Sequence, residues 1–153
     1  MNWYPLLLFV HVISIVVWVG GMFFAHQCLR PVAAQQLAPP ERLRLWNSVF
    51  ARFFPWVWAA AVLVPFSGLS IIGTIGWSAA PLRWHLMLLT GFVMIAIFLV
   101  VFFFPFRVLQ KSVQAQDWKS GGEALTRIRR LVGLNILLGL LTIAIATVGR
   151  LIA

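Results

Sequence analysis

Apolar residues dominate four stretches of the chain, and each stretch is long enough to cross a lipid bilayer. These stretches are residues 5–27, 55–76, 84–106 and 131–152. A helix of about 20 apolar residues crosses about 30 Å of hydrocarbon, and none of the four contains Asp, Glu or Lys. The pattern predicts an all-α fold, a four-helix transmembrane bundle that forms a single domain over residues 1–153.

The segment before the second stretch has a different pattern. Over residues 41–54, apolar side chains recur at helical spacing while polar ones lie largely elsewhere on the helix, and Pro40 suits the first turn. We interpret the segment as an interfacial amphipathic helix on the inner leaflet, with a partner-docking helix as the alternative. The third helix is expected to continue through Gln116 and to break at Gly121-Gly122. The apolar positions of the amphipathic segment are Leu43, Trp46, Phe50 and Phe53.

The basic residues indicate the orientation in the membrane. Ten of the 12 Lys and Arg residues lie in the two segments that follow the first and third stretches, while only Arg83 and Arg150 lie on the other side. Cytoplasmic loops carry an excess of Lys and Arg, so the ten-residue side is predicted to be cytoplasmic. An even number of spans then places both the N and C termini in the periplasm.

Composition supports the membrane class and excludes others. Hydrophobic residues make up 62% and charged residues 10% of the chain, whereas soluble domains have about 45–50% and about 25%. The net charge of +9 lies in short segments between apolar stretches, which indicates topology signals and no nucleic-acid partner. The first 29 residues contain no Lys or Arg, so we expect the first stretch to remain in the mature protein.

Histidines are the candidate ligands inside the membrane. His11 and His85 fall in the outer half of two parallel helices, where two imidazoles suit either a copper ion or the iron of haem b. Arg83 and Arg150 lie on the same side and would pair with haem propionates. The alternative is that the histidines form hydrogen bonds between helices and the arginines extend toward the headgroups.

A stripe along the first helix carries further candidates. His11, Trp18, Met22 and His26 recur on one face, and Trp18 would line a cofactor pocket or fill the core. Met22 and His26 are four residues apart and could offer a thioether and an imidazole to a second metal site near the cytoplasm. The only acidic residues lie in the loops, so hydrolytic carboxylate pairs are excluded and the transported species would be a metal ion or an electron.

The first helix also carries a resemblance to a known family. The run from His11 through Trp18 to Gly20-Gly21 resembles the opening helix of CopD-like bacterial membrane proteins, and Trp84-His85 and Gly149-Arg150 resemble small members of that family. HemJ-like protoporphyrinogen oxidases share the His-x6-Trp helix. This chain has Met87 where their Trp-x-x-Lys pattern expects Lys, which argues against that activity.

The resemblance implies copper or haem in the bacterial inner membrane, in a multi-pass protein surrounded by lipid. With four Met and one Cys, sulfur ligands are too few for a Cu(I) path across the bilayer, so the sequence favours a haem b protein with a redox or electron-transfer role. Copper binding or transport is the second hypothesis, and a structural or accessory subunit without metal is the third. A homo-oligomer or a redox partner fits any of them.

Overall fold

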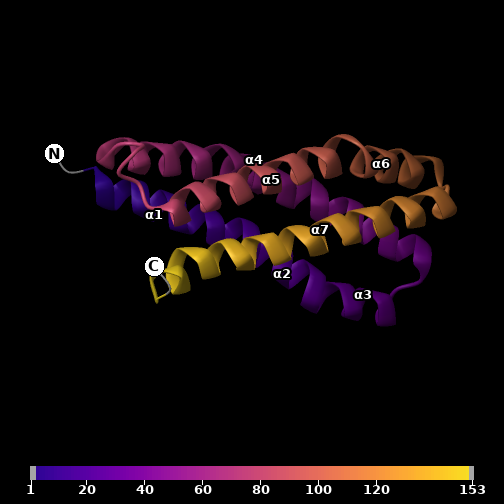
Figure 1. Cartoon of the computed structure of the whole chain (residues 1–153). Coiled ribbons are helices and arrows are strands. Elements are labelled where there is room, and N and C mark those ends of the chain that lie inside the picture. Colours follow the sequence, from indigo (N-terminus) through magenta and orange to yellow (C-terminus); the bar gives the residue numbers. More distant parts are fainter. Residues whose placement is uncertain (1–2, 152–153) are drawn as a thin grey trace.

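Four long helices, each antiparallel to the next along the chain, form an elongated bundle (Figure 1). The structure, a computed structural model, describes residues 3–151, with the backbone alone at residues 150 and 151. The candidate membrane spans are Tyr4–Gln36, Pro39–Ile75, Leu82–Ala115 and Trp118–Thr147. Each is apolar enough and more than long enough to cross a membrane, which confirms the all-α transmembrane prediction.

The first long helix is regular except at two points. It comprises α1 (Tyr4–Ile15), α2 (Gly21–Phe24) and α3 (Arg30–Gln36), joined by π-helical turns over Val16–Gly20 and Ala25–Leu29. π-helical turns inside α-helices are rare and are frequently found at functional sites. The first of these turns places Trp18 and Val19 in the core.

The second long helix, α4 (Pro39–Ile75), is uninterrupted and contains both Pro55 and Pro65. Its first part is the segment interpreted above as a surface helix. In the structure the apolar face of this segment packs into the bundle, where Leu43, Trp46 and Phe50 are each no more than 5% exposed, and its position relative to the inner leaflet stays a prediction. Helical periodicity shows that one face is apolar, but it does not reveal whether lipid or protein covers that face.

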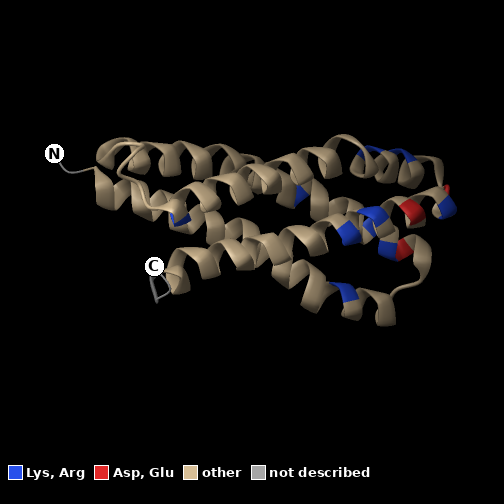
Figure 2. Ribbon diagram, in the orientation of Figure 1, with Lys and Arg blue, Asp and Glu red and all other residues tan. Residues whose placement is uncertain are grey.

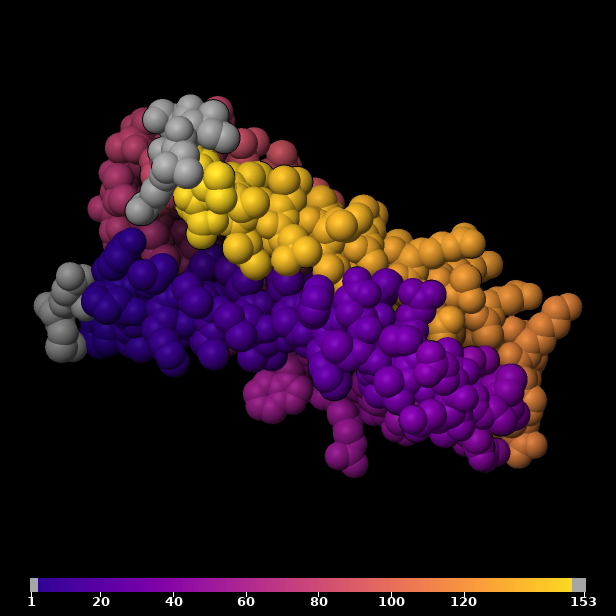
Figure 3. Space-filling view, turned by 90° about the horizontal axis from the view of Figure 1, so that it is seen from below, coloured from indigo at the N-terminus to yellow at the C-terminus, as the bar shows by residue number. Residues whose placement is uncertain are grey.

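The third and fourth helices complete the bundle. α5 (Leu82–Phe103) ends where Pro105 begins α6 (Pro105–Ala115), and α7 (Trp118–Thr147) leads into a final turn over Val148–Leu151. α4 packs along α1 at one end of the bundle and against α6 and α7 at the other. Figure 3 shows the helix of residues 4–36 lying beside α7.

The break between the last two helices does not fall at Gly121-Gly122. Gln116 takes a left-handed conformation (φ 57°) and ends α6, while the Asp117 carboxylate accepts a hydrogen bond from the Ser120 N–H and caps α7. Hydrogen bonds from the Ser120 side chain and from the Ser120 N–H hold the pKa of Asp117 below its ordinary value. Both glycines therefore lie inside α7, where Gly121 allows Leu43 to pack closely.

The two ends of the bundle differ in charge. Figure 2 shows most Lys and Arg residues gathered at the end formed by α3, α6 and the beginnings of α4 and α7. The chain ends marked N and C lie toward the opposite end (Figure 2). The structure therefore separates one basic end from one nearly uncharged end; we refer to them below as the inner and outer ends, following the predicted orientation.

Candidate functional site

His11 is held between the first two long helices by its Nδ1 atom. Nδ1 lies 3.1 Å from the carbonyl oxygen of Val64 and 2.9 Å from the hydroxyl oxygen of Ser67, both on α4. A Cβ on Gly68 would come within 3.2 Å of His11 Cε1, so the glycine leaves room for the ring. The imidazole is therefore fixed against α4 at the turn around Pro65.

These contacts determine the tautomer of His11. The Val64 carbonyl can only accept a hydrogen bond, so Nδ1 carries the proton and donates it. The Ser67 hydroxyl directs its own proton to carbonyls of its preceding turn, including Leu63, and accepts from Nδ1. In the neutral imidazole this leaves the lone pair on Nε2, which is the arrangement found in metal-bound histidines, where the other ring nitrogen is anchored on a carbonyl.

His85 has the same arrangement at the start of α5. Its Nδ1 lies 3.3 Å from the Pro81 carbonyl oxygen, which again assigns the proton to Nδ1 and leaves Nε2 as an acceptor. The ring also packs against Trp77, with 5.4 Å between ring centroids. Arg83 lies half-buried in the first turn of the same helix. The side chain of Arg150 lies outside the described residues, so its predicted role beside His85 stays a prediction.

The contacts that the structure gives the two rings go to different partners. His11 bonds to α4, whereas His85 bonds to the turn before its own helix. The shared site predicted for His11 and His85 is therefore not assembled by these contacts. Among the residues that the structure describes, no three or more His, Cys, Asp or Glu side chains group together in a way that could hold a metal ion.

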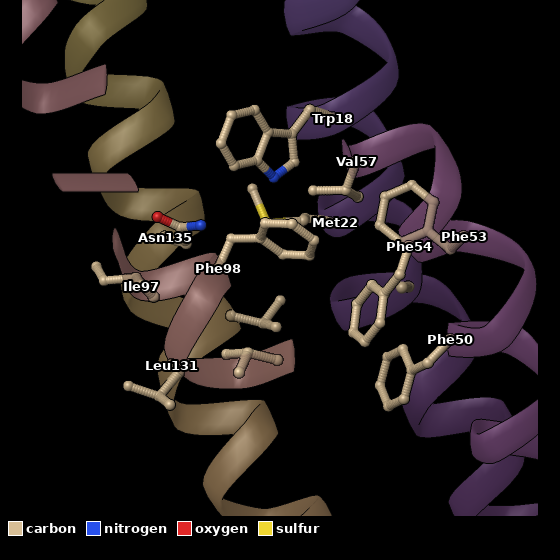
Figure 4. A pocket seen from close by; sticks show the side chains of 13 residues that line it. Trp18, Met22, Phe50, Phe53, Phe54, Val57, Ile97, Phe98, Leu131 and Asn135 are labelled. Atoms are coloured by element: carbon tan, nitrogen blue, oxygen red, sulfur yellow. The ribbon is translucent and has the colours of Figure 1, made fainter. Parts of the chain in front are cut away.

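Trp18 and Met22 point into the middle of the bundle. Both are nearly fully buried, and they line a cavity of about 30 Å³ together with Phe54, Phe98 and Asn135 (Figure 4). Trp18 meets Phe98 edge to face, with 6.2 Å between centroids. The cavity has room for about two water molecules, and Trp18 packs against Phe98 as part of the core around it.

His26 lies one turn further along, beside α7. Its Nε2 is 3.4 Å from the position that a Cβ on Gly133 would take, and the side chain lines a second, smaller cavity. Met22 lines the first cavity and His26 the second, while Ala25, Phe50 and Val132 line both, and the thioether–imidazole pair on this helix stays a prediction. Cys28, the single cysteine, is exposed.

Two polar residues that sequence reasoning passed over are buried in the bundle. Ser67 is fully buried against His11, and Asn135 is 3% exposed, with its Nδ2 donating to the Met94 carbonyl at 3.3 Å. The Asn135 Oδ1 has no hydrogen-bond partner among the described residues. Both could have been found from sequence, because a polar side chain inside an apolar span is costly in lipid and therefore informative.

The fold and these residues define a multi-pass α-helical membrane protein with two histidines anchored on backbone carbonyls. Comparison with known families matches residues 47–148 to CopD, described as copper resistance protein D. The match covers two thirds of the chain, and the protein belongs to the CopD family of multi-pass inner-membrane proteins. The matched residues include His85 and Ser67 but begin after His11 and Trp18. The match lends no support to the more distant HemJ resemblance. Comparisons with curated proteins and with solved structures find no match.

Proposed function

We propose that this protein binds copper in the outer half of the membrane as part of copper handling, with His11 Nε2 as the principal ligand. The observation that carries the proposal is the anchoring of His11 Nδ1 on Val64 and Ser67, which leaves Nε2 free. Imidazole is a ligand that copper prefers among protein side chains. The family to which the chain belongs is described by copper resistance, which agrees with this chemistry.

His85 is proposed as a second, outer ligand. Its Nδ1 is anchored in the same way, it lies in the first turn of α5, and Trp77 covers one side of its ring. At about 1.5 Å per residue, His11 and His85 differ by one to two helical turns in depth from the ends of their helices. Copper that arrives from the outer side would meet His85 first and His11 next.

Haem b, which the sequence favoured, is not part of this proposal. The cavity in the middle of the bundle measures about 30 Å³, and no porphyrin enters it without separation of the helices. The two histidines that would hold the iron also contact different elements. We therefore prefer copper to haem, and we assign no electron-transfer role.

The test is copper retention by the purified protein in detergent. After loading with copper and desalting, we expect His11→Ala to reduce bound copper to background and His85→Ala to reduce it in part. His26→Ala should leave most of it, because His26 lies about 22 Å further along the same helix. Ser67→Ala should weaken affinity about tenfold, since partners that orient a ligand histidine matter to this extent.

Two controls separate ligand loss from misfolding. Ser70→Ala removes a hydroxyl that bonds only within α4, so it should leave copper binding unchanged. Thermal unfolding of each variant reports folding independently. Full copper binding by His11→Ala would contradict the proposal, and a haem absorption band in the wild-type protein would restore the haem hypothesis. A colourless protein that binds no copper would favour the structural or accessory role.

A further inference from the structure

An exposed aromatic ring and an exposed arginine recur together on two helices. On α4, Trp56 is 65% exposed, and Arg52 lies four residues before it. Where α5 gives way to α6, Phe104 is 67% exposed, and Arg107 lies three residues after it. Because α4 and α5 run in opposite directions (Figure 1), the arginine lies nearer the inner end than the ring in both cases. We call these the two ring–arginine pairs.

Aromatic contacts between α4 and the α5–α6 segment show that the two ring–arginine pairs lie at one depth. Phe54 packs edge to face against Phe102 and Phe106, with 5.9 and 4.8 Å between ring centroids. Residue 54 is therefore level with the middle of residues 102–106. At about 1.5 Å per residue, the two arginines differ in depth by less than one helical turn, and so do the two exposed rings.

Neither arginine is neutralised by the protein. The side chains of Arg52 and Arg107 form no ion pair or hydrogen bond with another residue that the structure describes. Two of the three acidic residues, Glu41 and Asp117, instead accept hydrogen bonds from backbone N–H groups at helix starts. The Arg107 guanidinium lies 5.3 Å from the centroid of the Phe102 ring, so it turns back toward the spanning helix. Both positive charges are thus free to meet an anion at the depth of the exposed rings.

The lengths of the helices indicate what lies at this depth. From Trp56 to the outer end of α4 at Ile75 there are about 20 residues, or about 30 Å of helix. α5, which ends at Phe103, has 22 residues and is about 33 Å long. Both lengths match a hydrocarbon core of about 30 Å, and exposed aromatic rings are enriched where that core ends. The arginines therefore lie in the layer of phospholipid headgroups at the inner surface.

We propose that Arg52 and Arg107 each bind the phosphate of an anionic phospholipid in the inner leaflet, while Trp56 and Phe104 lie at the boundary of its acyl chains. Guanidinium groups bind phosphate oxygens through paired hydrogen bonds. Arg52 lies almost opposite Phe54 around α4, because two residues turn a helix by about 200°, so the two arginines contact different lipid molecules. These lipid sites are separate from the proposed copper ligands and do not depend on them.

The same placement determines how the inner end sits in the membrane. α4 is continuous, and Pro39 precedes Arg52 by 13 residues, so the helix extends about 20 Å beyond the headgroup layer. The amphipathic segment therefore stands out of the bilayer along the bundle axis, with its apolar face covered by protein. Leu43 and Leu109, each no more than 4% exposed, belong to this projecting part.

The test measures lipid retention by the delipidated full-length protein in detergent. Native mass spectrometry would count the molecules of phosphatidylglycerol or phosphatidylcholine that remain bound after each lipid is added at the same concentration. We expect phosphatidylglycerol to bind about fivefold more tightly than phosphatidylcholine at each site, since an arginine near an anionic surface contributes about this factor.

Three variants make the test specific. Arg52→Gln and Arg107→Gln should each remove one tightly bound phosphatidylglycerol from the number that the wild-type protein retains, and the double variant should remove two. Arg44→Gln is the matched control. Arg44 is also exposed, and its guanidinium lies over the Trp118 ring as that of Arg107 lies over Phe102. It precedes Arg52 by eight residues, about 12 Å further from the bilayer, so its loss should leave lipid retention unchanged.

Two results would overturn the proposal. One is that the wild-type protein retains phosphatidylglycerol no better than phosphatidylcholine. The other is that Arg44→Gln removes as much phosphatidylglycerol as Arg52→Gln and Arg107→Gln, which would mean diffuse attraction to the basic end. Thermal unfolding confirms that each variant is folded, and either arginine variant tests its own site if the other is not. Copper content is an independent readout, because all three variants should leave it unchanged.

Discussion

The outer and inner ends of the bundle are held together in different ways. At the outer end, α5 has no buried residue before Met94 and α7 has none after Gly139 within the described residues. At the inner end, Leu109 and Ile128 are almost completely inaccessible, and Phe50, Phe54 and Phe106 form edge-to-face and stacked aromatic pairs. α5 and α7 are therefore open in the outer half, although α4 buries Ser67, Ile71 and Ile72 there, and are closely packed in the inner half.

The solvent on each side explains this difference. Lipid tails are as apolar as a leucine side chain, so exposure of Leu82 and Leu137 to lipid does not destabilise the fold. Helices in lipid associate instead through hydrogen bonds and close packing. The outer half has such bonds, from His11 to Ser67 and from Thr142 to Thr90. We infer that water and headgroups reach the inner half, where burial of apolar surface stabilises the fold.

The polar side chains also differ between the outer and inner ends. The outer histidines each donate an Nδ1–H to a backbone carbonyl, and we propose their Nε2 atoms as metal ligands. The inner end instead gathers most of the Lys and Arg residues (Figure 2).

The largest expected effect concerns orientation, because its readout is all or none. Reporter fusions at Gln36 and Gln116 should be cytoplasmic, and fusions at Ala80 and Ala153 should be periplasmic, since ten of 12 basic residues lie on one side. Measurement of alkaline phosphatase and fluorescent-protein fusions at each site decides this. A periplasmic signal at Gln116 would reverse the assignment of inner and outer ends.

The next largest effect should be a difference in how much one leucine in each half contributes to the free energy of unfolding. Leu109→Ala should reduce the free energy of unfolding by about 2–5 kcal/mol, because it leaves a cavity in the close-packed inner half. Leu137→Ala, a matched change at a side chain that is 66% exposed, should cost much less, since lipid fills the space. Unfolding in mixed detergent micelles measures both. Equal losses would show that the two halves are packed alike.

The smallest effect should come from a single hydrogen bond in the outer half. The Thr142 hydroxyl lies 2.7 Å from the Thr90 hydroxyl and joins α7 to α5. Thr142→Val keeps the shape of the side chain and should cost about 0.6 kcal/mol, a typical value for such bonds inside membranes. Thr147→Val, whose hydroxyl bonds only within its own helix, is the control. A loss of several kcal/mol would mean that polar contacts dominate the outer half.

The sequence by itself determined the class of protein and its four helices. Lipid requires long apolar segments with internally bonded backbones, so their number and approximate limits follow from local composition. The resemblance to the CopD family was also readable in short motifs, and the family match confirms it. The charge asymmetry between the two ends was visible in the positions of the basic residues.

The partner of each side chain was decided only by the tertiary structure. Periodicity placed His11, Trp18, Met22 and His26 on one face, but it could not show that His11 would meet Ser67 and that His85 would turn to Pro81. The burial of Trp46 among α4, α7 and the first helix likewise depends on contacts between segments about 20 to 80 residues apart. A helical pattern records which face is apolar, whereas packing between helices selects what covers that face and which polar atoms remain unpaired.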